Sequence, residues 1–155
     1  MSINIVPPSH LKTHRSAIEE GAKLGGKTLD SSSWRIARDI FVADSTEEAL
    51  DGAINGTLGR DFRDYFFRYL PQTPYFRLLK THEDMLDADV TLEYMAENVW
   101  IVGSPDAVEA KIRQLHTDVG GFGVLLAMGH EWDPKGFWET SMALLKNEVM
   151  PKLNV

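Results

Sequence analysis

Two stretches of the chain have the apolar pattern of buried parallel strands. Residues 34–44, WRIARDIFVAD, alternate between two faces, and each face carries apolar side chains with one arginine, Arg35 on one and Arg38 on the other. A strand that is covered on both sides is typical of a parallel sheet. Residues 122–128, FGVLLAM, form a short continuous apolar run. This run predicts a second buried parallel strand.

Periodic apolar positions with start and stop signals predict helices around these strands. Ser45 and Glu48 have the spacing of a capping box, which satisfies free backbone donors where a helix begins. Ser104 followed by Pro105 predicts a helix over residues 105–118, closed by a double glycine. The expected buried stripe of this helix is Val108, Ile112 and Leu115. The last expected helix begins after Asp133-Pro134 and ends at Pro151. The other expected helices, with this last one, are Ser9–Leu24 (with Leu11, Ile18 and Ala22 on one face), Arg60–Tyr69, Leu92–Val99 and Lys135–Met150.

The order of these elements predicts one α/β domain over residues 1–155 with a long insertion. The insertion covers residues 57–100, and its irregular part, residues 72–90, is typical of a lid or binding loop. Two strands do not make a closed sheet. Three explanations are open: the sequence holds strands that its pattern does not reveal, the chain is part of a larger protein, or it pairs with another copy. Edge strands without a neighbour favour self-association, so an oligomer is expected.

Composition narrows the class of function. The chain has a net charge of -7, which disfavours nucleic acid and anionic membranes as partners. It has no cysteine, so disulfides, thiolate metal sites and cysteine nucleophiles are excluded. The first residues lack the pattern of a secretory signal, and no apolar run approaches the roughly 20 residues that span a bilayer. We therefore expect a cytoplasmic protein.

Several motifs taken together resemble one family. SSSWRIARDIFVADSTEEA resembles the penultimate strand and following helix of the bacterial luciferase-like, flavin-dependent monooxygenases. WIVGSPDAVEAKIRQLHTDVGGFGVLLAMGHEWDP, followed by SMALLKNEVMPKL, resembles the end of the same family, in particular its limonene or alkanal monooxygenase type. The resemblance implies a partial (β/α)8 barrel, a C-terminal segment with about two barrel strands and mostly helices, because a whole barrel needs about 250 residues.

The resemblance also implies a chemistry and partners. The parent reaction inserts one oxygen atom from O2 into an organic substrate, with reduced FMN from a separate flavin reductase. Relatives hold most of their flavin contacts in earlier strands, so this chain alone is expected to be inactive without the N-terminal barrel portion. The alternative is a non-catalytic α/β module, derived from the family, that serves binding or oligomerisation.

Candidate site residues lie where the predicted strands end. Function in a parallel barrel sits at the C-terminal ends of its strands, which makes His130 the candidate catalytic residue. Trp132 is a candidate for lining a flavin or substrate pocket, and Arg38 for a cofactor phosphate. A structural ion pair of Arg35 or Arg38 with Asp39 or another acid is favoured over the phosphate contact. No metal site is expected, because His10 and His14 lack an acidic ligand beside them.

Overall fold

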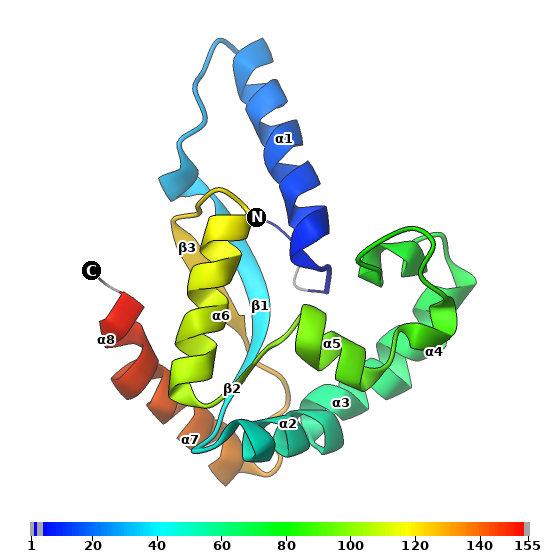
Figure 1. Cartoon of the computed structure of the whole chain (residues 1–155), viewed down its shortest axis with the longest axis vertical. Helices are drawn as coiled ribbons and strands as arrows, with labels where there is room; N and C mark the ends of the chain where they lie inside the picture. The colour runs from blue at the N-terminus through cyan, green and yellow to red at the C-terminus, as the bar shows by residue number, and fades with distance from the viewer. Residues whose placement is uncertain (1, 3–4, 154–155) are drawn as a thin grey trace.

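Three parallel strands form the centre of the fold (Figure 1). The computed structural model describes residues 2 and 5–153. The strands are β1 (Arg35–Val42), β2 (Ile101–Gly103) and β3 (Val124–Met128), in the order β2-β1-β3. The first part of β1 pairs with β3 and its last three residues pair with β2. Both predicted strands are therefore confirmed, but the prediction of two strands missed β2, which has only three residues.

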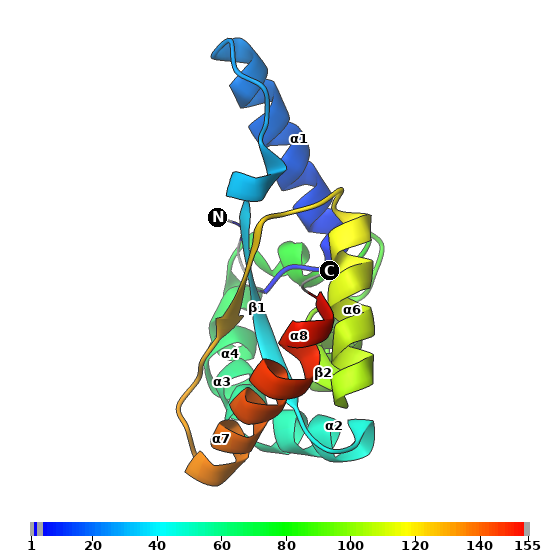
Figure 2. The same cartoon turned by 90° about the vertical axis from the view of Figure 1, so that its left-hand side faces the viewer.

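Helices surround this sheet and account for most of the chain (Figures 1 and 2). Among the described residues they are α1 (Pro8–Leu24), α2 (Thr46–Asn55), α3 (Thr57–Asp61), α4 (Phe67–Tyr69), α5 (Leu92–Asn98), α6 (Pro105–Asp118), α7 (Lys135–Leu144) and α8 (Met150–Leu153). Two π-helical turns, η2 (Phe62–Phe66) and η6 (Leu145–Val149), join α3 to α4 and α7 to α8. Short 3₁₀ turns occupy much of the segment between α4 and α5.

The capping signals place the helix starts as predicted. Ser45 accepts a hydrogen bond from the Glu48 backbone N–H, and the Glu48 side chain accepts one from the Ser45 backbone, which completes the capping box of α2. Ser104 caps α6, with Pro105 at its first position. The predicted stripe of α6 (Val108, Ile112 and Leu115) is buried.

Other helix predictions were wrong in detail. Leu11 of α1 is buried, but Ile18 is 36% exposed, because much of α1 projects beyond the sheet (Figure 2). Asp133 does not cap α7, whose N-cap is Pro134. Pro151 does not end the last helix, since it lies in α8, which directly continues the π-helical turn η6.

The two main strands differ in burial, and this difference defines an open side of the molecule. From Ile36 to Val42, β1 is buried on both faces, as predicted. The prediction that β3 is buried was wrong: Val124, Leu126 and Met128 are 36–37% exposed. The physical reason is that β3 is an edge strand, with β1 on one side and α6 packed over one face of the sheet (Figure 2).

Candidate active site

The His130 side chain lies just beyond β3 and is held between two carboxylates. Its Nδ1 atom is 2.8 Å from Oδ2 of Asp61, and its Nε2 atom is 2.9 Å from Oδ1 of Asp39. Asp39 is fully buried, His130 is 12% exposed and Asp61 is 35% exposed. Both nitrogens can donate only when the ring is a charged imidazolium, so the geometry favours the protonated form.

The fold brings these three residues together from distant parts of the chain. Asp39 lies on β1, opposite Met128 at the end of its pairing with β3. His130 follows two residues after Met128, and Asp61 ends α3, inside the predicted insertion. The His130 ring also lies 6.0 Å from that of Trp138, an almost fully buried residue of α7. Four elements therefore fix the imidazole.

The electrostatics of the site favour the charged form of His130. Burial by itself lowers the pKa of His130, since it disfavours the charged ring. The hydrogen bonds and negative charges of Asp39 and Asp61 act in the other direction and prevail, so the pKa of His130 is raised above its usual value.

Further contacts tie the loop after β3 to α3. The Arg60 guanidinium lies 2.5 Å from the Glu131 carboxylate and 3.9 Å from that of Asp133. The Thr57 hydroxyl donates to the backbone carbonyl of Asp133 at 2.5 Å. With the His130–Asp61 contact, these bonds join the start of the predicted insertion to the loop at the C-terminal end of β3.

An open hollow of about 460 Å³ lies beside His130. Its lining combines the imidazole, aromatic rings and charges of both signs. The lining residues are Arg60, Asp61, Asp64, Tyr65, Phe66 and His130. The Tyr65 and Phe66 rings are 5.2 Å apart in an edge-to-face arrangement, so the hollow has one apolar wall.

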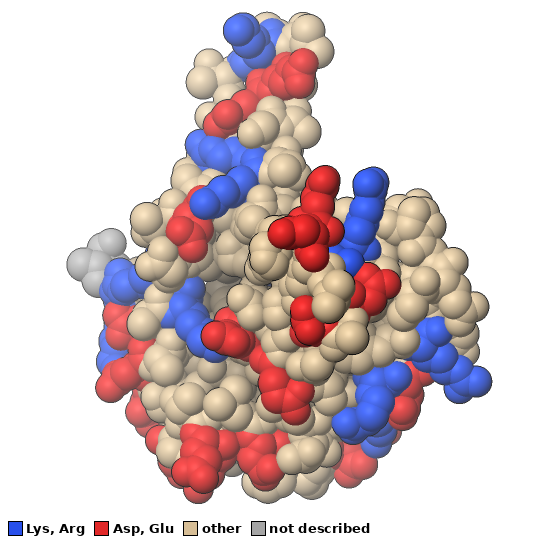
Figure 3. Space-filling model, turned by 45° about the vertical axis from the view of Figure 1, so that its right-hand side comes forward, with Lys and Arg blue, Asp and Glu red and all other residues tan. Residues whose placement is uncertain are grey.

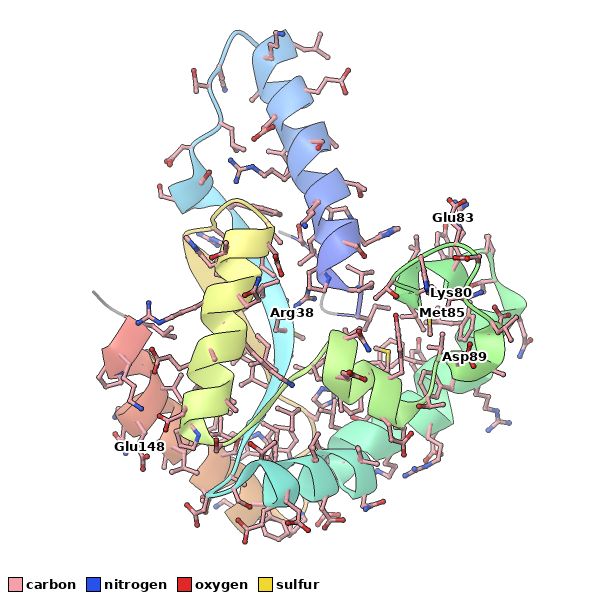
Figure 4. The ribbon with its side chains drawn as sticks, in the orientation of Figure 1. Arg38, Lys80, Glu83, Met85, Asp89 and Glu148 are labelled. Carbon is pink, nitrogen blue, oxygen red and sulfur yellow. The ribbon has the colours of Figure 1, made fainter. Side chains whose placement is uncertain are left out.

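Arg38 lies on the other face of β1 from Asp39, because successive side chains of a strand point in opposite directions. Figure 4 shows it between α1 and α6. It is 1% exposed and lines a separate cavity of about 320 Å³ together with Lys111 of α6. Burial lowers the pKa of Arg38 to about 10, although the negative charge of Asp39 acts to raise it. The structure does not bring Arg38 to the His130 hollow, and its role in holding a cofactor stays a prediction.

Trp132 lies in the loop that leaves β3 and is 44% exposed. It is not among the residues that line the hollow beside His130.

Within residues 2 and 5–153, no group of three His, Cys, Asp or Glu side chains is placed to hold a metal ion. The His10 and His14 rings, 6.2 Å apart, contact each other edge to face.

The sequence located His130 but missed Asp61, 69 residues away. No local spacing connects the two positions, and the only available signal was the position of Asp61 in the segment expected to cover the site.

The surface gives further information on partners. On the face shown in Figure 3, acidic and basic side chains are interspersed, with no broad basic patch among the described residues. None of the described helices combines the length and apolar character needed to cross a bilayer.

Comparison with known proteins finds clear relatives, although no protein-family model matches the sequence. The chain is 34% identical to 3,6-diketocamphane 1,6-monooxygenase of Pseudomonas putida, over 92% of its own length and 38% of the relative's. It is 28% identical to limonene 1,2-monooxygenase of Rhodococcus erythropolis, over 97% of its own length and 36% of the relative's. Thus the chain spans about two fifths of the length of these relatives.

Solved structures agree with the sequence matches. The oxygenating constituent of 3,6-diketocamphane monooxygenase from Pseudomonas putida, a type II Baeyer-Villiger monooxygenase in complex with FMN, superimposes with a TM-score of 0.80 at 32% identity, over 92% of this chain and 39% of that one. The monooxygenase RslO1 of Streptomyces bottropensis has the same fold at 19% identity. It superimposes with a TM-score of 0.63 over 97% of this chain and 40% of that one.

Proposed function

Because this chain corresponds to part of a luciferase-like, flavin-dependent monooxygenase, we propose that it is one portion of an enzyme that inserts an oxygen atom from O2 into an organic substrate. The observation that carries the proposal is the superposition on an oxygenating protein that holds FMN. In the proposed whole enzyme, β1 and β3 are neighbouring strands of a (β/α)8 barrel and α6 is the helix that precedes β3. Their parallel pairing supports this placement.

The cofactor proposed for the whole enzyme is reduced FMN. When bound, reduced FMN supplies the two electrons that activate O2, so that one oxygen atom enters the substrate and the other leaves as water. The structural relative is described as the oxygenating constituent of its enzyme, which supports a separate flavin reductase as the source of reduced FMN.

The hollow beside His130 fits only part of this cofactor. Its aromatic wall suits a flat ring system. A phosphate group needs uncompensated positive charge, but Arg60 is paired with Glu131 and Asp133, and two carboxylates, Asp61 and Asp64, also line the hollow. The FMN phosphate therefore does not fit here. We propose that its contacts come from the barrel portion that this chain does not span.

For His130 we propose a positioning role. Both of its ring nitrogens are engaged by carboxylates, so the charged ring holds the loop after β3 against α3. This arrangement shapes the mouth of the site and excludes water from Asp39, which is fully buried. We further propose that residues 57–100 form the lid region and that Trp132 lines the mouth from the other side of the loop. Partial exposure of Trp132 supports this assignment.

The test measures flavin binding and oxygenation separately. FMN is titrated into the chain alone, then into the chain mixed with the portion of the Pseudomonas putida relative that it does not match. Oxygenation is assayed with NADH, a flavin reductase and, as probes, the diketocamphane and limonene named for the relatives.

We expect no turnover by the chain alone and turnover by the mixture. Turnover by the chain alone would contradict an incomplete enzyme. A folded mixture that neither binds FMN nor oxygenates either probe would favour the alternative, a non-catalytic module.

A further inference from the structure

A second cavity is lined by residues of α1, α5 and α6 and shares no lining residue with the hollow beside His130. Its volume is about 320 Å³, which is within the range of small-molecule sites. Buried apolar side chains form one wall of this cavity, namely Val99, Ile101 and Leu115. The oxygenase chemistry proposed above does not use this cavity.

The buried part of the cavity lining carries positive charge. Arg38 is 1% exposed, and its pKa of about 10 keeps the guanidinium charged at neutral pH. Asp39, the acid that acts on Arg38, is held by His130 at 2.9 Å. Lys111 of α6 is half-buried and donates one hydrogen bond, to the backbone carbonyl of Ala96 at 3.1 Å. Because an ammonium group has three donors, Lys111 has donors left for a ligand.

Trp100 adds a buried donor to the same lining. Its side chain is 2% exposed, and its Nε1–H has no hydrogen-bond partner among the residues that the structure describes. A buried donor without an acceptor costs free energy. The lining therefore favours a ligand that brings a hydrogen-bond acceptor, and a carboxylate is the acceptor that suits guanidinium and ammonium groups best.

Two carboxylates lie at more exposed positions of the lining. Glu97 is exposed, and Asp118 is half-buried and accepts a hydrogen bond from the neutral Gln114 amide at 3.0 Å. The charged lining thus holds two positive and two negative side chains. These carboxylates repel a simple anion, and the buried cations repel a simple cation. A molecule that carries both charges satisfies both sets of side chains.

We propose that this cavity binds a small zwitterion with an apolar body, of the class of a free amino acid. The ligand carboxylate accepts hydrogen bonds from Arg38, Lys111 and Trp100. The ligand ammonium lies toward Glu97 and Asp118, and the apolar body packs on the apolar wall. Because the site is separate from the hollow beside His130, the proposal does not depend on the proposed function.

Isothermal titration calorimetry of the chain tests the proposal with three probes that share one hydrocarbon body. Leucine carries both charges, 4-methylpentanoate lacks the ammonium group, and 3-methylbutylamine lacks the carboxylate. We expect leucine to bind, and each of the other two to bind at least about tenfold more weakly, because each loses hydrogen bonds to charged groups. Absence of leucine binding by the folded chain, or equal binding of the three probes, overturns the proposal.

Matched lysine variants test the residues. Lys111→Met removes one charge from the cavity and should weaken leucine binding by about tenfold. Lys135→Met is the control, because the Lys135 side chain is 73% exposed on α7 and does not line the cavity, so leucine binding should not change. Equal leucine binding by these two variants overturns the proposal. Circular dichroism and thermal melting show whether each variant is folded.

Glu97→Gln tests the other end of the site at an exposed position, where folding is least at risk. It should weaken binding of leucine and leave binding of 4-methylpentanoate unchanged or stronger, since only leucine carries the ammonium group. Equal losses for the two probes overturn the assignment of a zwitterion. This variant decides the matter if Lys111→Met does not fold.

Discussion

Replacing His130 by alanine removes the charge that holds two carboxylates at the end of β3. Asp39 is fully buried and 2.9 Å from the ring, and loss of one partner of a buried pair costs about 3 kcal/mol or more. Asp61 is 35% exposed, so its contact is partly screened by solvent and adds only about 0.5–1 kcal/mol. We therefore expect His130→Ala to lower the free energy of unfolding by about 3–4 kcal/mol near pH 6.

The same contacts predict how stability changes with pH. The pKa of His130 is raised in the folded protein, whereas in the unfolded chain it takes its ordinary value of about 6.5. The protonated ring therefore stabilises the fold fully below about pH 6.5, and this contribution is lost as the pH rises through the folded pKa. The His130→Ala variant lacks this part of the pH dependence.

Urea denaturation from pH 5 to 9, followed by tryptophan fluorescence, measures both effects, and NMR titration of the imidazole measures the folded pKa directly. His82→Ala is the control, because the His82 side chain is 62% exposed and its loss should change stability by less than about 0.5 kcal/mol. An NMR pKa at or below the ordinary value, or equal stability losses in the two variants, would refute the reasoning.

Three further predictions concern the scaffold, and all are measured by chemical or thermal denaturation. Ser45→Ala removes the capping box of α2 and should cost about 1 kcal/mol; an unchanged midpoint would show that the cap contributes nothing. Gly59→Ala should be strongly destabilising, because an added Cβ would lie 1.8 Å from a backbone oxygen, whereas Gly136→Ala meets no atom within 4 Å and should be tolerated. Equal effects of the two glycine changes would contradict this. Trp138→Ala should cost about 3–5 kcal/mol because the side chain is 3% exposed, while Phe137→Ala, at 61% exposed, should have little effect.

The predictions that succeeded rest on local patterns. The capping box at Ser45, the buried stripe of α6 and the two-sided burial of β1 each depend on residues within one or two turns or along one strand. Such features can be predicted from the sequence because helix caps and strand alternation depend on residues that are close together in the chain. The family resemblance, confirmed by the relatives, likewise rests on contiguous motifs.

The predictions that failed depend on what packs against an element. The apolar run of β3 has the composition of a buried strand, but its exposure is decided by whether another strand lies beside it. β2 was missed because three residues carry too little periodicity, and pairing with β1 makes it a strand. Pro151 lies within a helix because α7, η6 and α8 follow one another without a break.

The sequence by itself determined the α/β class, the strand β1, the helix starts and the place of His130 after a strand. Only the tertiary structure decided that His130 lies between Asp39 and Asp61, that Arg38 lines a separate cavity together with Lys111, and that β3 is exposed. The physical reason is that the backbone hydrogen bonds of helices and helix caps join residues only a few positions apart in the chain. A buried charge, by contrast, must find its partner across the fold, and for His130 those partners are 69 and 91 residues away in the chain.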